Sequence, residues 1–272
     1  MPTALIFSSF VAANRIGGGA QQLALTALGF EAYLAPTVVL GRNPARGAAG
    51  QVVEAETFSG LIQGLEAEGL FARADLVISG YFANAAQVAV AADAIGKVRA
   101  AAPRVTVVVD PILGDHPKGL YVPPEVAQAI ATLLVPQANW ITPNAWELGH
   151  LAGCAIDTAA DAADAVDRLG VRALVTSAPA EADEIALMLF DGPDSCLYAH
   201  PRRAQAPNGT GDLTAAVFAA GLAQGLAPRE AAAAAAAAMH MVDAAAALGD
   251  LPLAQLVRAL REPAPGLRLQ PL

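Results

Sequence analysis

The sequence predicts an α/β fold: a three-layer αβα sandwich with a mostly parallel central sheet and an antiparallel edge. Short apolar runs of strand length alternate along the chain with longer segments of helical spacing. These strand-length runs lack polar alternation, which is typical of parallel strands buried on both faces. Two adjacent strand-like runs around the turn 191–193 predict the antiparallel edge. No Ser- or Pro-rich linker divides the chain, so we expect a single domain over residues 1–272.

Each element has a local reason. Residues 105–109 are rich in β-branched side chains, which favour a strand, and Pro124 suits the first turn of a helix. The predicted strands are residues 4–8, 33–40, 76–79, 105–109, 140–142, 173–176, 185–190 and 196–199. The predicted helices are residues 17–28, 61–70, 85–101, 124–134 and 159–169, with further helices from Gly211 onward.

Composition excludes some classes of function. The net charge of −9 disfavours nucleic acid as a partner, because nucleic-acid binding needs a basic face. Hydrophobic residues make up 55% and the mean hydropathy is +0.45. The longest apolar stretch, 231–248, is mostly alanine and is interrupted by His240 and Asp243, so we expect a buried helix and no membrane contact. Two isolated cysteines and the absence of a charged leader favour the cytoplasm.

Ligands of such sheets bind beyond the carboxyl ends of the strands. After the first strand, Gly17-Gly18-Gly19 precedes a helix but matches neither the P-loop nor the dinucleotide fingerprint. This turn is either a phosphate cradle or, as we favour, a site of close strand–helix packing.

Acidic residues follow two further strands. Asp110 and Asp115 flank a Pro/Gly turn and are either ligands of one Mg²⁺ or solvated turn acids. Next, Thr142-Pro143 predicts a helix capped by Thr142, with Glu147 near its start.

The most informative segment is 207–216, a loop that opens a long apolar helix. Gly209 and Gly211 let the backbone bend so that several N–H groups point the same way, and the helix N-terminus adds positive potential. Asp212, in the first turn, either complements the helix dipole or acts as a general base beside an anion hole.

These segments carry a family resemblance. Asn208-Gly-Thr-Gly-Asp212, followed by an Ala-rich helix, resembles the signature of the ribokinase-like kinases. The segments Ser79-Gly-Tyr81, Asp110 to Asp115, Lys118 to Val122, and Thr142 to Leu148, together with Ser9, resemble the pyridoxal kinases, with the hydroxymethylpyrimidine kinases as near relatives.

The resemblance implies a kinase that uses Mg²⁺ and ATP to phosphorylate the 5′-hydroxymethyl group of pyridoxal. Asp212 would be the base, and Gly209, Thr210 and Gly211 would bind the transferring phosphoryl group. The remaining implied contacts are Asp110, Glu147 and Asp115 for Mg²⁺; Asp110, Asn144, Glu147, Thr176 and Ser177 for the nucleotide; and Ser9 and Tyr81 for the acceptor. The segments 41–50 and 200–207 would flank the substrates. K⁺ and a homodimer are further family expectations.

The acceptor half departs from the pyridoxal kinase pattern. Phe10 stands where those enzymes commonly carry His, and Arg42 to Gly47 replaces an Asn-His-Thr-Gly-Tyr stretch. Hydroxymethylpyrimidine or another hydroxymethyl heterocycle therefore remains an alternative acceptor. A vitamin-binding protein without activity is a third hypothesis, disfavoured by the intact Asp212 segment.

Overall fold

A ten-stranded sheet runs through the part of the chain that the computed structural model describes, namely residues 1–47, 50–181, 184–202, 207–245, 251 and 268–271. The strand order is β12-β11-β10-β9-β8-β5-β4-β1-β2-β3. Its centre is parallel, as predicted, and comprises β2 (Glu31–Leu40), β1 (Thr3–Val11), β4 (Ala74–Ser79), β5 (Thr106–Val109), β8 (Trp140–Ile141) and β9 (Ala173–Ala178).

Antiparallel strands lie at both ends of this sheet. The predicted hairpin is present as β10 (Glu184–Phe190) and β11 (Cys196–Pro201), and β12 (Arg268–Pro271) pairs with β11. At the other edge, β3 (Gly50–Val52) pairs with β2. Neither β3 nor β12 was predicted, because both are short and are fixed by pairing rather than by a local pattern. A separate two-stranded sheet joins β6 (Gly114–Asp115) and β7 (Gly119–Leu120).

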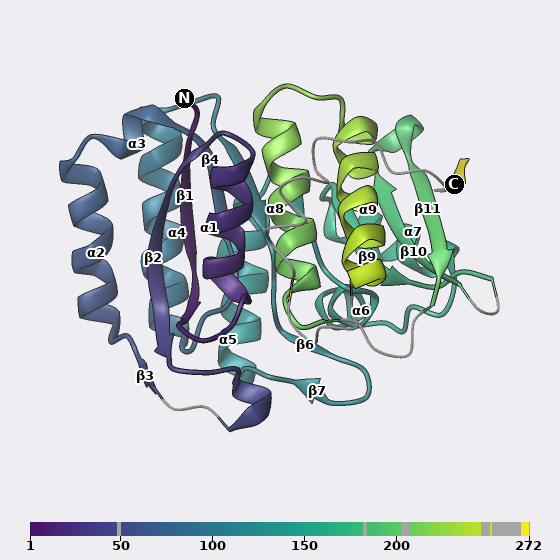
Figure 1. Ribbon diagram of the computed structural model, residues 1–272, viewed down its shortest axis with the longest axis horizontal. Helices are drawn as coiled ribbons and strands as arrows, with labels where there is room; N and C mark the ends of the chain where they lie inside the picture. Colours follow the sequence, from purple (N-terminus) through teal and green to yellow (C-terminus); the bar gives the residue numbers. More distant parts are fainter. Residues whose placement is uncertain (48–49, 182–183, 203–206, 246–250, 252–267, 272) are drawn as a thin grey trace.

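Helices cover both faces of the sheet. On one face lie α1 (Gly17–Ala27), α8 (Thr210–Ala223) and α9 (Pro228–Ala245), which stand in front of the sheet in Figure 1. The other face carries α2 (Ala55–Ala67), α3 (Leu70–Arg73), α4 (Ala85–Ala101), α5 (Pro124–Ala129), α6 (Ala145–Ala152) and α7 (Ala159–Leu169). Each face has its own hydrophobic core, which confirms the three-layer prediction.

Two predicted helices differ from the observed ones. The expected helix 61–70 begins earlier, at Ala55, because Phe58 packs edge-on against Phe7 and Phe82 and draws another turn onto the sheet. Gly69, at φ +70°, then separates α2 from α3. The expected helix 124–134 is helical throughout, but Ile130–Leu134 forms a π-helical turn.

Small side chains bring α8 and α9 together. A Cβ added at Gly221 would lie 2.9 Å from the Cβ of Ala231, so the two helix backbones approach closely. The alanine-rich segment is thus a helix packed in the core, and no helix within the described ranges is long and apolar enough to cross a membrane.

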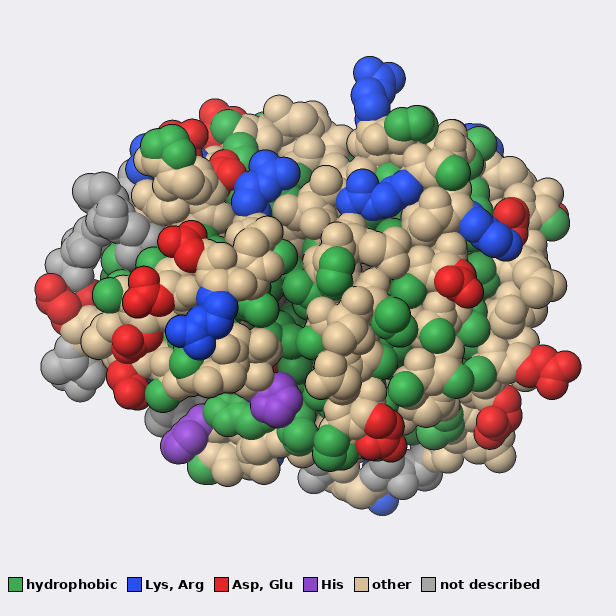
Figure 2. Space-filling model, turned by 180° about the vertical axis from the view of Figure 1, so that it is seen from behind, with side chains coloured by type: hydrophobic (Ala, Val, Ile, Leu, Met, Phe, Trp, Pro, Cys, Tyr) green, Lys and Arg blue, Asp and Glu red, His purple; other side chains and the backbone are tan. Residues whose placement is uncertain are grey.

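On the face seen in Figure 2, Lys and Arg side chains stand apart, with Asp and Glu side chains around them.

Candidate active site

The candidate site lies at the edge of the sheet where the parallel strands end, which is the lower edge in Figure 1. Ser9 stands near the end of β1, Tyr81 follows β4, and Asp110 follows β5. The N-termini of α1 and α8 reach the same edge. Residues distant in sequence meet here because parallel strands share one carboxyl edge.

The start of α8 has a conformation that requires glycine. Gly209 precedes the helix with φ +92°, and a Cβ at this position would collide with the Arg15 carbonyl oxygen. The Thr210 hydroxyl donates to the Pro207 carbonyl at 2.7 Å, which fixes the turn. The first i→i−4 hydrogen bond of the helix runs from the Leu213 amide to the Gly209 carbonyl at 3.0 Å, so helix geometry leaves the amides of Gly211 and Asp212 for an anion.

The two carboxylate oxygens of Asp212 differ in their surroundings. Oδ2 accepts a 2.8 Å hydrogen bond from the Gly17 backbone amide, whereas Oδ1 is buried without a hydrogen-bond partner. Burial raises the pKa of Asp212 to about 6, against the opposing effect of the Gly17 hydrogen bond. An unpartnered, weakly acidic carboxylate at a helix N-terminus is suited to take a proton from a substrate hydroxyl.

Gly17 and Gly18 lie in the first turn of α1 and pack closely against β1 and β2, in agreement with the favoured interpretation. A Cβ at Gly17 would overlap the Ser9 hydroxyl, and a Cβ at Gly18 would lie 2.5 Å from Leu34. The Gly17 amide is also bonded to Asp212. The sequence did not reveal this role of Gly17, whose partner is 195 residues away.

Asp110 and Glu147 are buried carboxylates, and the charges of both Glu147 and Asp212 act on Asp110. Burial, then the charge of Glu147, then that of Asp212 raise the pKa of Asp110, while the Thr142 hydroxyl acts in the opposite direction. Burial raises the pKa of Glu147 to about 7, opposed by backbone hydrogen bonds. Such closely spaced negative charges create a place where a cation would be stabilised.

The helix that carries Glu147 is capped by Asn144, not by Thr142 as predicted. Asn144 Oδ1 accepts from the Glu147 amide at 2.9 Å, and a Glu147 oxygen accepts from the Asn144 amide at 2.8 Å. Thr142 instead follows β8 directly, where its amide donates to the Val109 carbonyl. An Asn two residues later offers the better cap because Glu147 stands at the third helical position.

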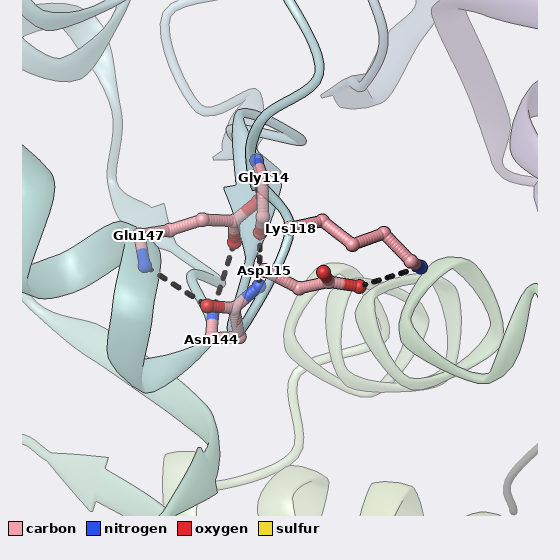
Figure 3. A network of polar contacts seen from close by, with 5 residues as sticks. All are labelled: Gly114, Asp115, Lys118, Asn144 and Glu147. Carbon is pink, nitrogen blue, oxygen red and sulfur yellow. Dashed lines mark hydrogen bonds and ion pairs between the residues drawn. The ribbon is translucent and has the colours of Figure 1, made fainter.

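The same pair holds the Asp110–Asp115 turn (Figure 3). Figure 3 shows Asn144 Nδ2 donating to the Gly114 carbonyl, at 2.8 Å. Glu147 Oε1 also accepts from the Leu113 amide at 2.7 Å. Ile112 lies in this turn with φ +44°, a strained conformation that the surrounding contacts maintain. The Asp115 carboxylate is 3.4 Å from the Lys118 ammonium group within the β6–β7 hairpin.

The remaining predicted residues lie in two places: Thr176 and Ser177 at the end of β9, and Ser9 and Tyr81 at the ends of β1 and β4. Thr176 and Ser177 lie at the end of β9 next to α6, where the Thr176 amide donates to the Pro143 carbonyl at 2.9 Å and Ser177 has φ +52°. Ser9 is buried against Gly17. Tyr81 is half-buried, and its amide donates to the Ser8 hydroxyl at 3.2 Å. Residues 48–49 and 203–206 of the flanking segments lie outside the described residues.

The donor set matches the chemistry of Mg²⁺ without forming a protein cage. Within the residues that the structure describes, no three His, Cys, Asp or Glu side chains are placed to hold a metal together. Both Glu147 oxygens already accept backbone amides. Mg²⁺ commonly retains several waters and binds through one or two carboxylates and substrate phosphates, and Asp110 with its neighbours fits that arrangement.

Comparison with known proteins places these features in context. Residues 17–250 match the family model described as phosphomethylpyrimidine kinase. A pyridoxine/pyridoxal/pyridoxamine kinase of Bordetella avium is 33% identical over 96% of this chain and 90% of its own length. A pyridoxal kinase of Deinococcus radiodurans is 35% identical over 79% of this chain and 76% of its own length.

Solved structures agree on the fold. The pyridoxal kinase of Entamoeba histolytica superposes with a TM-score of 0.91 at 21% identity and covers 99% of both chains. The pyridoxal kinase of Leishmania donovani, in complex with ADP and pyridoxamine, superposes with a TM-score of 0.91 at 22% identity and covers 100% of both.

Proposed function

The chain belongs to the phosphomethylpyrimidine kinase family, and from this premise we propose that it transfers the γ-phosphoryl group of ATP to the 5′-hydroxymethyl group of pyridoxal. Its relatives in Bordetella avium and Deinococcus radiodurans are kinases of this vitamin group. The observation that carries the proposal is the unpartnered Oδ1 of Asp212 at the N-terminus of α8. A binding protein without activity would have no use for a buried carboxylate oxygen at an anion-binding helix start.

Asp212 is the base in the proposed reaction. Its carboxylate takes the proton of the 5′-hydroxyl group as that oxygen attacks the γ-phosphorus of ATP. The bond from the γ-phosphorus to the bridging oxygen breaks, and ADP leaves with the electron pair. The Gly17 amide orients Asp212 through Oδ2, which leaves Oδ1 for the proton.

The helix start binds the group in transfer. The amides of Gly209, Gly211 and Asp212 stand where the α8 dipole is positive and would donate to the phosphoryl oxygens, whereas the Thr210 amide already donates to the Pro207 carbonyl at 3.4 Å. The acidic net charge of the protein does not oppose this, because the positive potential comes from backbone dipoles.

Asp110, Glu147 and Asp115 would hold Mg²⁺, mainly through water. The ion would neutralise charge on the nucleotide phosphates. Glu147 also fixes the 113–114 backbone, and Asn144, Thr176 and Ser177 border the proposed phosphate region from β9 and α6. Ser9 and Tyr81 stand on the side of β1 and β4, where we place the pyridine ring of the acceptor; K⁺ is a further proposed cofactor.

Two observations point to hydroxymethylpyrimidine as a second candidate acceptor beside pyridoxal. Phe10 is 38% exposed in place of the His common in pyridoxal kinases, and the family model that matches is that of phosphomethylpyrimidine kinases. Hydroxymethylpyrimidine is therefore the alternative acceptor.

An acceptor panel tests both. The purified protein with Mg²⁺ and ATP is given pyridoxal, pyridoxine, pyridoxamine and hydroxymethylpyrimidine, and ADP and phosphorylated product are measured. We expect turnover with pyridoxal. Turnover restricted to the pyrimidine would select the alternative, and no turnover with any acceptor at millimolar concentration would refute kinase activity of this type.

The domain organisation, oligomeric state and cellular location of the protein are also part of the proposal. We infer that residues 1–272 form one domain, since strands from the first and last described segments join the same sheet. A homodimer in the cytoplasm, with small-molecule partners only, follows the family expectation. Analytical ultracentrifugation of the purified protein measures the oligomeric state.

A further inference from the structure

The buried side chain of Gln87, which has no part in the proposed phosphoryl transfer, bonds to three backbone segments near the proposed acceptor site. Gln87, in the first turn of α4, is fully buried. Its Oε1 accepts from the Ala83 amide at 2.9 Å, and its Nε2 donates to the carbonyls of Thr37 at 2.8 Å and Val53 at 2.6 Å. The side chain therefore uses both donors and its acceptor oxygen on backbone groups.

Two of these contacts hold the legs of one hairpin. Thr37 belongs to β2, and Val53 follows β3 directly; the Val53 amide donates to the Thr37 carbonyl at 3.0 Å. The segment between them includes the 41–50 loop, which is proposed to flank the substrates. Gln87 thus fixes the base of this hairpin to the start of α4, near the lower left of Figure 1.

The third contact leads to Tyr81. Ala83 lies in the turn after β4, and the Thr37 hydroxyl donates to the Tyr81 carbonyl at 2.6 Å. The Tyr81 amide in turn donates to the Ser8 hydroxyl. The Tyr81 backbone is consequently bonded to both β1 and β2. Gln87 in turn bonds to Ala83, in the turn that follows Tyr81, and to Thr37 of β2.

We propose that Gln87 is a positioning residue that sets the spacing between Tyr81 and the base of the β2–β3 hairpin, and thereby the fit of the acceptor. This rests on the proposed function, because it takes Tyr81 and the hairpin as acceptor walls. The hydrogen bonds of Gln87 join it to the β2, β3 and β4 side of the molecule, whereas Asn144, Thr176 and Asp212 stand on other elements. Its loss therefore affects the acceptor and spares the nucleotide.

The test is Gln87→Met, which keeps the length and removes both donated bonds and the bond accepted from the Ala83 amide. We expect the KM for pyridoxal to rise roughly tenfold, since small misplacements at a binding site have large effects. The dissociation constant for Mg²⁺·ADP is expected to stay within about twofold. Equal weakening of acceptor and nucleotide, or an unchanged acceptor KM in the folded variant, would overturn the proposal.

Gln137→Met is the matched control. The Gln137 amide also donates to two backbone carbonyls, those of Ala92 and Leu133, but away from the hairpin. Since Gln137 is only partly buried, we expect a smaller loss of thermal stability than in Gln87→Met, and no change in the KM for pyridoxal. If Gln87→Met fails to fold, Thr37→Val removes only the hydroxyl bond to Tyr81; it should raise the same KM, and Thr37→Ser should restore it. No rise with Thr37→Val would count against the proposal.

Hydrogen exchange separates this proposal from the acceptor assignment. In Gln87→Met, faster amide exchange is expected at Val53 and in the turn around Ala83, with unchanged exchange in α6. This readout holds even if pyridoxal is not the acceptor. Unchanged exchange at Val53 would refute the positioning role regardless of the substrate.

Discussion

At Asp212, one carboxylate oxygen is bonded to Gly17 and the other has no partner. Asp212→Asn keeps the shape and removes the base. We expect kcat to fall by at least about 100-fold, because a positioned general base contributes that much or more. ATP binding, measured by calorimetry, should persist. Asp164→Asn, at an exposed position of α7, is the control and should leave kcat unchanged; an Asp212→Asn rate within tenfold of wild type would remove Asp212 from the base role.

The pKa of Asp212 sets a pH dependence. Burial raises this pKa from 3.8 to about 6, so the carboxyl group is protonated, and unable to accept a proton, below that pH. We expect kcat/KM for the acceptor to be constant above the pKa and to fall about tenfold per pH unit below it, because kcat/KM follows the ionisation of the free enzyme. Initial rates at acceptor concentrations well below KM, between pH 5 and 8, check this. A kcat/KM that stays flat down to pH 5 would contradict the assignment.

The two glycines at the start of α8 are needed for different reasons: Gly209 for its backbone conformation, and Gly211 for the space that it leaves for the substrate. Gly209 needs φ +92° and has no room for a Cβ, whereas a Cβ at Gly211 would meet nothing within 4 Å. Gly209→Ala should therefore cost about 1–3 kcal/mol of stability together with activity. Gly211→Ala should leave the melting temperature unchanged and lower only kcat, because the added methyl group would crowd the phosphoryl group. Loss of stability in Gly211→Ala would argue against this division.

At the scale of elements, α6 and α7 begin with the same capping box but have different tasks. Asn144 and Glu147 cap α6 and also hold the Asp110–Asp115 turn, while Thr158 and Asp161 cap α7 only. Asn144→Ala should lower the stability by about 1 kcal/mol and also reduce kcat/KM for ATP. Thr158→Ala should cost comparable stability in thermal denaturation without affecting kinetics. Equal kinetics in both variants would show that the α6 cap has no part in the site.

Element boundaries were predictable where local signals act alone. The helices Ala85–Ala101 and Ala159–Leu169 match their predicted ranges, because helical spacing and a polar cap define each of them. The cap of α6 was misassigned, since Thr142 and Asn144 are both good caps and only the Glu147 side chain selects between them. The helix α2 begins earlier than predicted because a tertiary contact of Phe58 extends it.

At the scale of the whole molecule, the site draws on elements from both ends of the chain. Because the site exists only when these elements are folded together, Mg²⁺·ADP should raise the free energy of unfolding of the whole protein. At 100 times the dissociation constant the gain is about 2.7 kcal/mol, which corresponds to a rise in melting temperature of roughly 5–11 °C. ADP with EDTA should give a smaller shift, because Asp110 and Glu147 then face the phosphates without a cation. Equal shifts with and without Mg²⁺ would contradict the metal assignment.

The sequence by itself determined the α/β order, the parallel centre of the sheet and the Asn208–Asp212 segment that opens α8. These features follow from burial patterns and turn chemistry, which act over a few residues. Only the tertiary structure decided the Gly17–Asp212 bond, the Gln87 contacts with Thr37 and Val53, and the pairing of β12. Each of these joins distant backbone groups whose partners depend on how helices pack on the sheet, and no local pattern specifies that packing.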